Sequence, residues 1–197
     1  MLAAKPSQRL ILVLAGLVWA GAIVGGFGTL IHEGYTPVPA TSPGTQFPRS
    51  TGLALDAKRS TLILFAHPQC PCTRATLHEL NELLADTAGK VDATMVFVVP
   101  PGVPRGFEQG PLWKAASGIP GLRRVIDAGG RMAESFHVIG SGHVLLFDPS
   151  GKLLFSGGIT GSRGHEGDNA GRDAVESLVL TGKANLNRTP VYGCELL

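Results

Sequence analysis

Cysteine is scarce in this chain, which has three among its 197 residues. That number is too small for a disulfide-rich scaffold, and two of the three, Cys70 and Cys72, stand one residue apart. Such a placement is more common in reactive or metal-binding sites than in structural cross-links. The cysteines therefore indicate a reactive or metal-binding site.

Runs of basic residues are missing as well. The formal net charge is +2, and the charges are interspersed, so the chain shows no electrostatic footprint for nucleic acid. The glycine-rich segment 157–169 lacks the Gly-Lys-Ser/Thr ending of a P-loop and the spacing of a dinucleotide fingerprint. We therefore expect neither a nucleic-acid partner nor a nucleotide.

Charged residues are absent from the apolar run 10–31. About 20 such residues in a helix span the hydrocarbon layer of a membrane. Lys5 and Arg9 precede the run, whereas His32 and Glu33 follow it, so the positive-inside rule keeps the N-terminus cytoplasmic. We expect one pass through the cytoplasmic (inner) membrane, with the soluble part in the periplasm.

A cleaved signal peptide is the competing interpretation, because Val38 and Ala40 satisfy a small-residue cleavage pattern. The apolar run is longer than a normal signal-peptide core, which favours a retained anchor. The prolines that follow, among Thr, Ser and Gly, predict an extended tether. The expected organisation is a cytoplasmic N-terminus (1–9), a transmembrane anchor (10–31), a tether (32–50) and a folded domain (51–197).

The folded domain begins with a βαβ pattern. Residues 61–65 form a short apolar run, 73–88 carry apolar residues at helical spacing, and 93–99 form a second apolar run of the kind buried in a parallel sheet. Weaker patterns predict a helix at 112–117, a strand at 124–127 and helical turns at 130–137.

A hairpin and a last helix complete the pattern. The runs 143–147 and 152–156 flank Asp-Pro-Ser-Gly, a sequence typical of a turn, and Asp168 or Asn169 can cap a final helix. The order βαβ, helix, hairpin, helix predicts an α/β thioredoxin-like fold, a central mixed sheet flanked by helices, behind one N-terminal transmembrane helix.

Cys70 is the expected nucleophile. It follows a buried strand and precedes Pro71, a residue suited to the first position of a helix. As the N-cap, its sulfur would face free N–H groups and the positive end of the helix dipole, which lower a thiol pKa.

The partner of Cys70 is left open by the sequence. Residues two apart on a helix do not face each other, so a Cys70–Cys72 disulfide would be strained and easily reduced. The alternatives are a labile disulfide within the motif, a pair that ligates a metal, or a Cys70 resolved by the distant Cys194.

Several other residues are candidates for supporting roles. His67 lies three residues before Cys70, and His143 opens the hairpin beside the active-site helix of a thioredoxin fold, so either could bind metal or hold a proton. Arg163 and His165, in the glycine-rich segment, could favour an anionic sulfur.

The domain resembles the thioredoxin-like superfamily and, most closely, the small RedB-type proteins. The resemblance is carried by His67–Arg74, Ser141–Asp148, Ser156–Thr160 and Thr189–Cys194. It implies a membrane-bound or periplasmic redox protein. Two features depart from ordinary thioredoxins: the cysteines have one intervening residue instead of two, and Gly142 stands where that fold normally has a cis-proline.

Three functional hypotheses follow. The first is thiol–disulfide exchange with periplasmic protein thiols and disulfides, through Cys70 and either Cys72 or Cys194. This would be an oxidoreductase activity, and we expect it to need no cofactor. The second is copper binding or transfer, because two nearby cysteines and His143 are similar to the ligands of Sco-type copper chaperones; Cu(I) would then be held by Cys70, Cys72 and His143. The third is a non-catalytic, tethered interaction module.

Overall fold

The computed structural model describes residues 6–197, so the first five residues of the predicted cytoplasmic segment lie outside the described part. The described chain divides into two compact units, one ending at Thr36 and the other formed by Pro37–Leu197. The elements are α1 (Pro6–Tyr35), β1 (Ser60–Ala66), α2 (Thr73–Asp86), β2 (Val91–Val99), α3 (Pro111–Ser117), β3 (Leu122–Ala128), α4 (Arg131–Ser135), β4 (His143–Phe147), β5 (Leu153–Gly158) and α5 (Ala170–Thr181).

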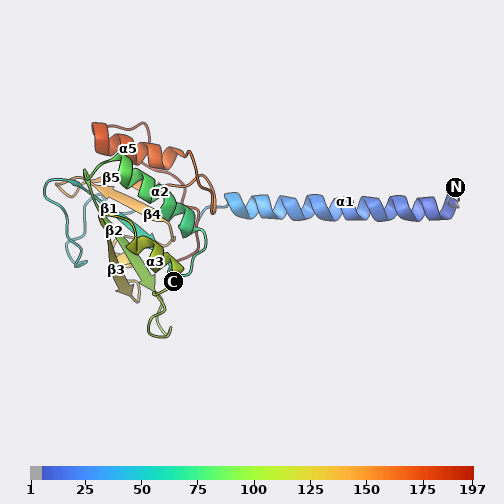
Figure 1. Ribbon diagram of the computed structural model, residues 1–197, viewed down its shortest axis with the longest axis horizontal. Helices are drawn as coiled ribbons and strands as arrows, with labels where there is room; N and C mark the ends of the chain where they lie inside the picture. Colours follow the sequence, from blue (N-terminus) through green and yellow to red (C-terminus); the bar gives the residue numbers. More distant parts are fainter. Residues whose placement is uncertain (1–5) are drawn as a thin grey trace. The chain divides into compact units, whose positions relative to one another are not determined.

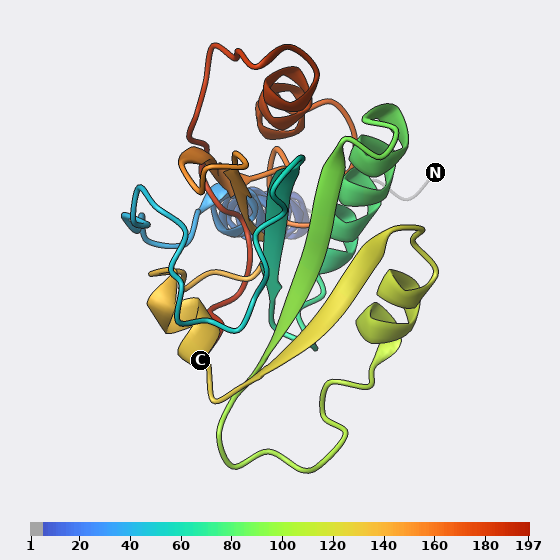
Figure 2. The same cartoon turned by 90° about the vertical axis from the view of Figure 1, so that its left-hand side faces the viewer.

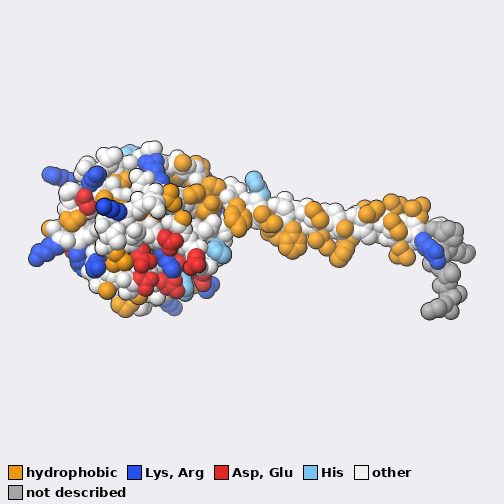
Figure 3. All heavy atoms as spheres, turned by 90° about the horizontal axis from the view of Figure 1, so that it is seen from above, with side chains coloured by type: hydrophobic (Ala, Val, Ile, Leu, Met, Phe, Trp, Pro, Cys, Tyr) orange, Lys and Arg blue, Asp and Glu red, His pale blue; other side chains and the backbone are white. Residues whose placement is uncertain are grey.

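The first unit is the single helix α1. It is long and apolar enough to cross a membrane: within Ser7–Tyr35, an 18-residue window has a mean hydropathy of 2.4, and none of that window is buried against the rest of the chain. Figure 3 shows apolar side chains along the length of this helix. At 1.5 Å per residue, its 30 residues measure about 45 Å, more than the roughly 30 Å of a hydrocarbon core.

The second unit is built on a five-stranded mixed sheet in the order β3-β2-β1-β4-β5 (Figure 1). Strands β1, β2 and β3 are parallel to one another, β4 runs antiparallel to β1, and β5 runs antiparallel to β4. The predicted βαβ unit and hairpin are confirmed. Helices α2 and α3 cover one face of the sheet and α4 the other (Figure 2).

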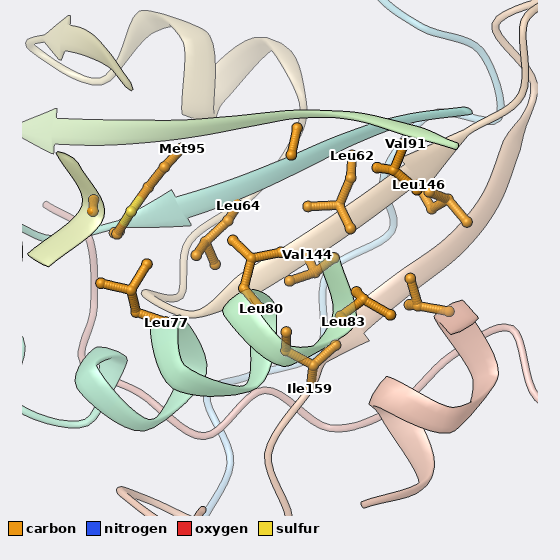
Figure 4. Packing of buried hydrophobic residues seen from close by; sticks show 14 of the residues in the cluster. Leu62, Leu64, Leu77, Leu80, Leu83, Val91, Met95, Val144, Leu146 and Ile159 are labelled. Carbon is orange, nitrogen blue, oxygen red and sulfur yellow. The ribbon is translucent and has the colours of Figure 1, made fainter. Parts of the chain in front are cut away.

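Two apolar clusters account for the uninterrupted apolar run 62–66 of β1. Leu62 and Leu64 point to the α2 side, where they join a cluster that includes Leu80 and Ile159 (Figure 4). Ile63 and Phe65 point to the opposite face and pack with α4 residues and aromatic rings. Since successive strand residues alternate between faces and both faces are covered, every position from Leu62 to Ala66 is apolar.

The segment expected to be a tether contacts the domain over much of its length. The Val38 N–H donates to the Val191 carbonyl at 2.8 Å, and the Phe47 N–H donates to the Gly151 carbonyl at 2.8 Å. The Phe47 ring packs edge-on against Phe136 and Phe147. Prolines keep this stretch extended, and an extended chain is free to run along a surface and place an occasional apolar side chain in it.

The helix after the cysteine motif begins later than the sequence predicts. Cys72, in αR conformation, is the N-cap of α2, whereas Cys70 was expected there. The cause is a tight first turn, in which the Arg74 N–H donates to the Pro71 carbonyl at 3.3 Å. At the other end of the domain, Asn169 caps α5 as predicted, because its side chain accepts from the Arg172 N–H.

A buried glutamate of α2 holds the glycine-rich loop that precedes α5. Glu79 is fully buried and accepts hydrogen bonds from the Gly167 N–H at 2.6 Å and from the Asn169 amide at 3.2 Å. It also forms an ion pair with Arg172 at 2.9 Å, and Arg172 in turn contacts Glu82. A buried charge of this kind is tolerated because it is paired and hydrogen-bonded on several sides.

We expect Glu79→Ala to lower the free energy of unfolding by about 3–5 kcal/mol, because it leaves a half-buried guanidinium and two loop donors without their acceptor. The measurement is urea denaturation of the full chain in detergent, followed by tryptophan fluorescence. Glu82→Ala is the matched control: its side chain is 44% exposed, and it should cost no more than about 1 kcal/mol. Equal losses of unfolding free energy from the two variants would contradict the role of Glu79 in holding the loop.

Candidate functional site

The site is centred on Cys70, which lies in the turn between β1 and α2. Its side chain is buried, with 3% of the residue exposed, and its N–H donates to the His67 carbonyl at 3.1 Å. The hydroxyl and the N–H of Thr73, the first residue of α2, both hydrogen-bond the sulfur. Although Cys70 is not the N-cap, a free N–H at the start of the helix still reaches it.

Cys194 reaches the same place from the C-terminal segment. The Cys70 and Cys194 sulfurs are 3.0 Å apart. Two backbone hydrogen bonds hold the segment there: the Ser141 N–H donates to the Cys194 carbonyl at 2.8 Å, and the Leu196 N–H donates to the Ile139 carbonyl at 2.9 Å. The chain thus runs beside residues 139–141 like a short added strand.

Gly193 makes this close approach possible. A Cβ atom built on Gly193 would lie 1.9 Å from the Ser141 carbonyl oxygen, a separation that no side chain tolerates. The absence of a side chain therefore lets the segment pack directly against the backbone at Ser141. Gly193 is therefore a positioning residue, and no pattern in the sequence singles it out.

Cys72 completes a group of three sulfurs that all lie within 4.8 Å of one another. Cys72 and Cys194 are half-buried, whereas Cys70 is buried. Arg163 comes from the glycine-rich loop and hydrogen-bonds Cys72. Arg163 thus lies beside a thiol whose pKa is raised, and its expected role near an anionic sulfur stays a prediction; Glu79 hydrogen-bonds Gly167 of the same loop.

The thiol pKa values of Cys70 and Cys194 are driven apart. Burial works to raise the pKa of Cys70, but hydrogen bonds from Cys194 and Thr73 outweigh it and lower that pKa to about 7. Burial, together with the hydrogen bond between Cys194 and Cys70, raises the pKa of Cys194 to about 12. Burial and the neighbouring Cys70 raise the pKa of Cys72 too, against the influence of Arg163. Cys70 is the thiolate of the group.

Ser141 ties the turn, the helix and the C-terminal segment together. Its hydroxyl accepts from the His67 N–H at 2.8 Å and lies 2.7 Å from the Thr73 hydroxyl. Its backbone N–H donates to the Cys194 carbonyl. Ser141 and Thr73 both fall within segments that carry the family resemblance, but nothing in their spacing marked them as site residues. Their role depends on contacts between residues far apart in the chain.

Gly142 occupies the position where a cis-proline was noted as missing. Its φ is +91°, a conformation that favours glycine, and its N–H donates to the Phe65 carbonyl at 2.8 Å. A Cβ atom here would come within 3.1 Å of the Thr76 hydroxyl oxygen. There is no cis peptide bond among the described residues.

The other histidine candidates lie outside the sulfur group. His67 Nδ1 accepts from the Gln69 N–H at 3.2 Å, and the ring stands edge-on to Phe107. Burial lowers the pKa of His67, so it is neutral and shapes the turn. His165 is exposed in the glycine-rich loop, near Gly161.

His143, the expected copper ligand, is engaged elsewhere. It is buried, and its Nε2 lies 2.8 Å from the Ser156 hydroxyl. Burial, with a contribution from the positive charge of Arg188, lowers the pKa of His143 to about 4. The structure groups Cys194 with Cys70 and Cys72, and it does not bring His143 to them. A ligand set on this site would consist of three sulfurs.

No protein family model matches the chain, and no curated protein matches it. Among solved structures, the chain is similar to a hypothetical protein from Sinorhizobium meliloti 1021, with a TM-score of 0.62 and 19% identity over 82% of this chain and 97% of that one. It is also similar to an uncharacterized conserved protein from Geobacillus kaustophilus, with a TM-score of 0.60 and 20% identity over 83% and 90%.

A third similar structure is a secreted disulfide oxidoreductase from Mycobacterium tuberculosis, at a TM-score of 0.46 and 16% identity, covering 64% of this chain and 82% of that one. Identities this low concern the fold alone. The mixed five-stranded sheet with helices on both faces confirms the fold expected from the sequence: the domain has a thioredoxin-like fold, preceded by an apolar helix that could span a membrane.

Proposed function

We propose that this protein is a membrane-anchored, extracytoplasmic thiol–disulfide oxidoreductase of the RedB type, in which Cys70 and Cys194 are the redox pair. The observation that carries the proposal is the 3.0 Å separation of their sulfurs, combined with pKa values of about 7 and about 12. Such a pair provides a nucleophilic thiolate and a second thiol poised to resolve it.

The exchange begins at the Cys70 thiolate. It attacks one sulfur of a partner's disulfide, a bond forms between Cys70 and that sulfur, and the other partner sulfur leaves as a thiolate. Cys194 gives up its proton and attacks Cys70, which releases the first partner sulfur as a thiolate that takes up a proton. The partner disulfide is reduced by two electrons and a Cys70–Cys194 disulfide is formed; the reverse sequence oxidises a partner dithiol.

Access to Cys70 requires the C-terminal segment to move. Cys70 is buried, and Cys194 covers part of its environment, while Cys72 is half-buried and adjacent. The segment is irregular rather than helical, and it is held by backbone hydrogen bonds and by the buried side chain of Leu196, so its displacement is a local opening of the domain. The Cys72 sulfur lies within 4.8 Å of the other two, so a disulfide can be exchanged among the three cysteines.

The membrane location is supported by the anchor and its flanking charges. Within α1, the apolar run 10–31 is preceded by Arg9 and followed by His32 and Glu33. By the positive-inside rule, this charge pattern exports the thioredoxin-like domain to the periplasm, an oxidising compartment where protein thiols and disulfides are the available partners.

The reactivity of Cys70 should follow its thiolate fraction. In a Cys72→Ser background, we expect alkylation of Cys70 by iodoacetamide to be half-maximal near pH 7 and to fall about tenfold per pH unit below that. Adding Cys194→Ala removes the sulfur's hydrogen-bond donor and should shift the midpoint toward the ordinary thiol pKa of about 8.5. Rates are read by mass spectrometry of the Cys70 peptide; an unchanged midpoint would contradict the assigned donor.

The pairing can be read from thiol counts after oxidation by glutathione disulfide. We expect the oxidised wild-type chain to retain one of its three thiols, and Cys72→Ser to retain none, because Cys70 and Cys194 still pair. Cys194→Ser should keep its two thiols reduced under conditions that oxidise the wild type. Ready oxidation of the Cys194→Ser chain to an internal disulfide would instead make Cys70–Cys72 the working pair.

Soft-metal binding is the second candidate, and the observation that favours it is the convergence of three sulfurs within 4.8 Å. Thiolates are the ligands that Cu(I) prefers, and three of them can surround one ion. Cys194 takes the place that sequence reasoning gave to His143. On this interpretation the protein would carry copper, and the metal would be its cargo.

A copper titration separates the two candidates. If Cu(I) binds the three sulfurs, the fully reduced chain should take up one equivalent, and Cys194→Ser should weaken the binding by at least tenfold. His143→Gln is the matched control and should leave it unchanged, since His143 lies outside the group. Competition with a colorimetric Cu(I) chelator measures the affinities. Thiols that neither exchange nor bind copper would support the interaction module instead.

A further inference from the structure

A cavity of about 510 Å³ lies on the domain apart from the three sulfurs. None of the cysteines lines it. Its walls come from the extended segment 37–41, from residues 139–140, from the start of β4 and the middle of β5, and from residues 188–191. The volume falls within the roughly 300–1,000 Å³ that is usual for small-molecule sites.

The walls combine an apolar lining with a few polar groups. Val38, Ile139 and Val191 supply aliphatic surface, and three prolines add to it. The polar contributions are His143 and Ser156, which hydrogen-bond each other, together with the side chains of Thr41 and Arg188. A mainly apolar wall with a small number of convergent polar groups is the composition of a ligand site.

Thr41 gives an independent indication of a ligand. Its hydroxyl oxygen is buried and has no hydrogen-bond partner; among the described residues, only one other buried side-chain atom is in that condition. An unsatisfied buried hydroxyl costs about 1–3 kcal/mol, and most such groups in proteins find a partner. Because this oxygen has almost no exposed surface, a rotation of the Thr41 side chain would turn it into the cavity, where a polar ligand atom would supply a partner.

The charge of the lining residues indicates which polar group a ligand in the cavity would carry. Arg188 is the only lining residue with a formal charge at pH 7, since burial lowers the pKa of His143 to about 4 and leaves that ring neutral. Arg188 is exposed and makes no ion pair within residues 6–197 as described. No carboxylate lines the cavity to oppose an anion.

We propose that this cavity binds a small amphiphilic carboxylate, with its carboxylate at Arg188 and Thr41 and its aliphatic chain against Val38, Ile139 and Val191. A guanidinium offers a fork of donors that matches a carboxylate, and the apolar wall favours an aliphatic body over a compact inorganic anion. The site is distinct from the thiol chemistry, and it does not depend on it.

Octanoate is the probe for the test, with the full chain reconstituted in nanodiscs. Equilibrium dialysis of labelled octanoate, corrected with empty nanodiscs, should show saturable binding to one site per chain. Arg188→Gln should weaken binding at least tenfold, and Thr41→Val should weaken it severalfold. Arg105→Gln, which removes an exposed arginine outside the cavity, is the matched control and should bind as the wild type does.

A second readout locates the ligand and tests its charge. In histidine-labelled protein, the ring resonance of His143, assigned with His143→Gln, should shift on octanoate addition and should not shift with octanamide, which has the same chain and no charge. Binding that is equal in wild type and Arg188→Gln, equal for octanoate and octanamide, or no greater than in empty nanodiscs would overturn the proposal. Because neither readout involves the thiols, its failure would leave the proposed redox function unaffected, and the reverse also holds.

Discussion

The pairing of the C-terminal segment with residues 139–141 is the constraint on which the site depends. Two backbone hydrogen bonds and the bare backbone of Gly193 fix this segment against Ser141, and Cys194 is thereby held against Cys70. The same contact supplies the hydrogen bond that helps make Cys70 a thiolate. Without the segment, only the hydrogen bonds from Thr73 would oppose the effect of burial on the Cys70 pKa, so backbone geometry at one glycine bears on the chemistry of a sulfur on another element.

Much of the fold could be predicted from local pattern. Both faces of the sheet are covered, which accounts for the apolar runs 62–66 in β1 and 95–99 in β2, and the turn sequence between β4 and β5 identified the hairpin. Asp168 or Asn169 was predicted to cap the last helix, and Asn169 does so because its short side chain accepts from a free N–H. The start of α2 was displaced because a tight turn at Pro71 delays the regular helix.

The composition of the site was harder to predict because it depends on contacts distant in sequence. Strand alternation could have placed His143, since it shares a face with Leu145 and pairs with Phe65, both on the side of the sheet away from α2. No periodic pattern marks the segment that carries Cys194, because it forms an isolated bridge with Gly140 rather than a regular strand. The sequence could therefore name Cys194 as a candidate without deciding its partner.

The distance along the chain between the two paired cysteines has a consequence for how the protein matures. Cys70 and Cys194 are separated by 124 positions, so a bond between them would close a loop around nearly the whole domain. If the domain is exported as proposed, with the N-terminal helix first, Cys70 and Cys72 emerge long before Cys194 does, and during that interval they can react with each other or with oxidants. Contacts of such long range form late. The correct pairing would then depend on the fate of these two thiols before the last residues arrive.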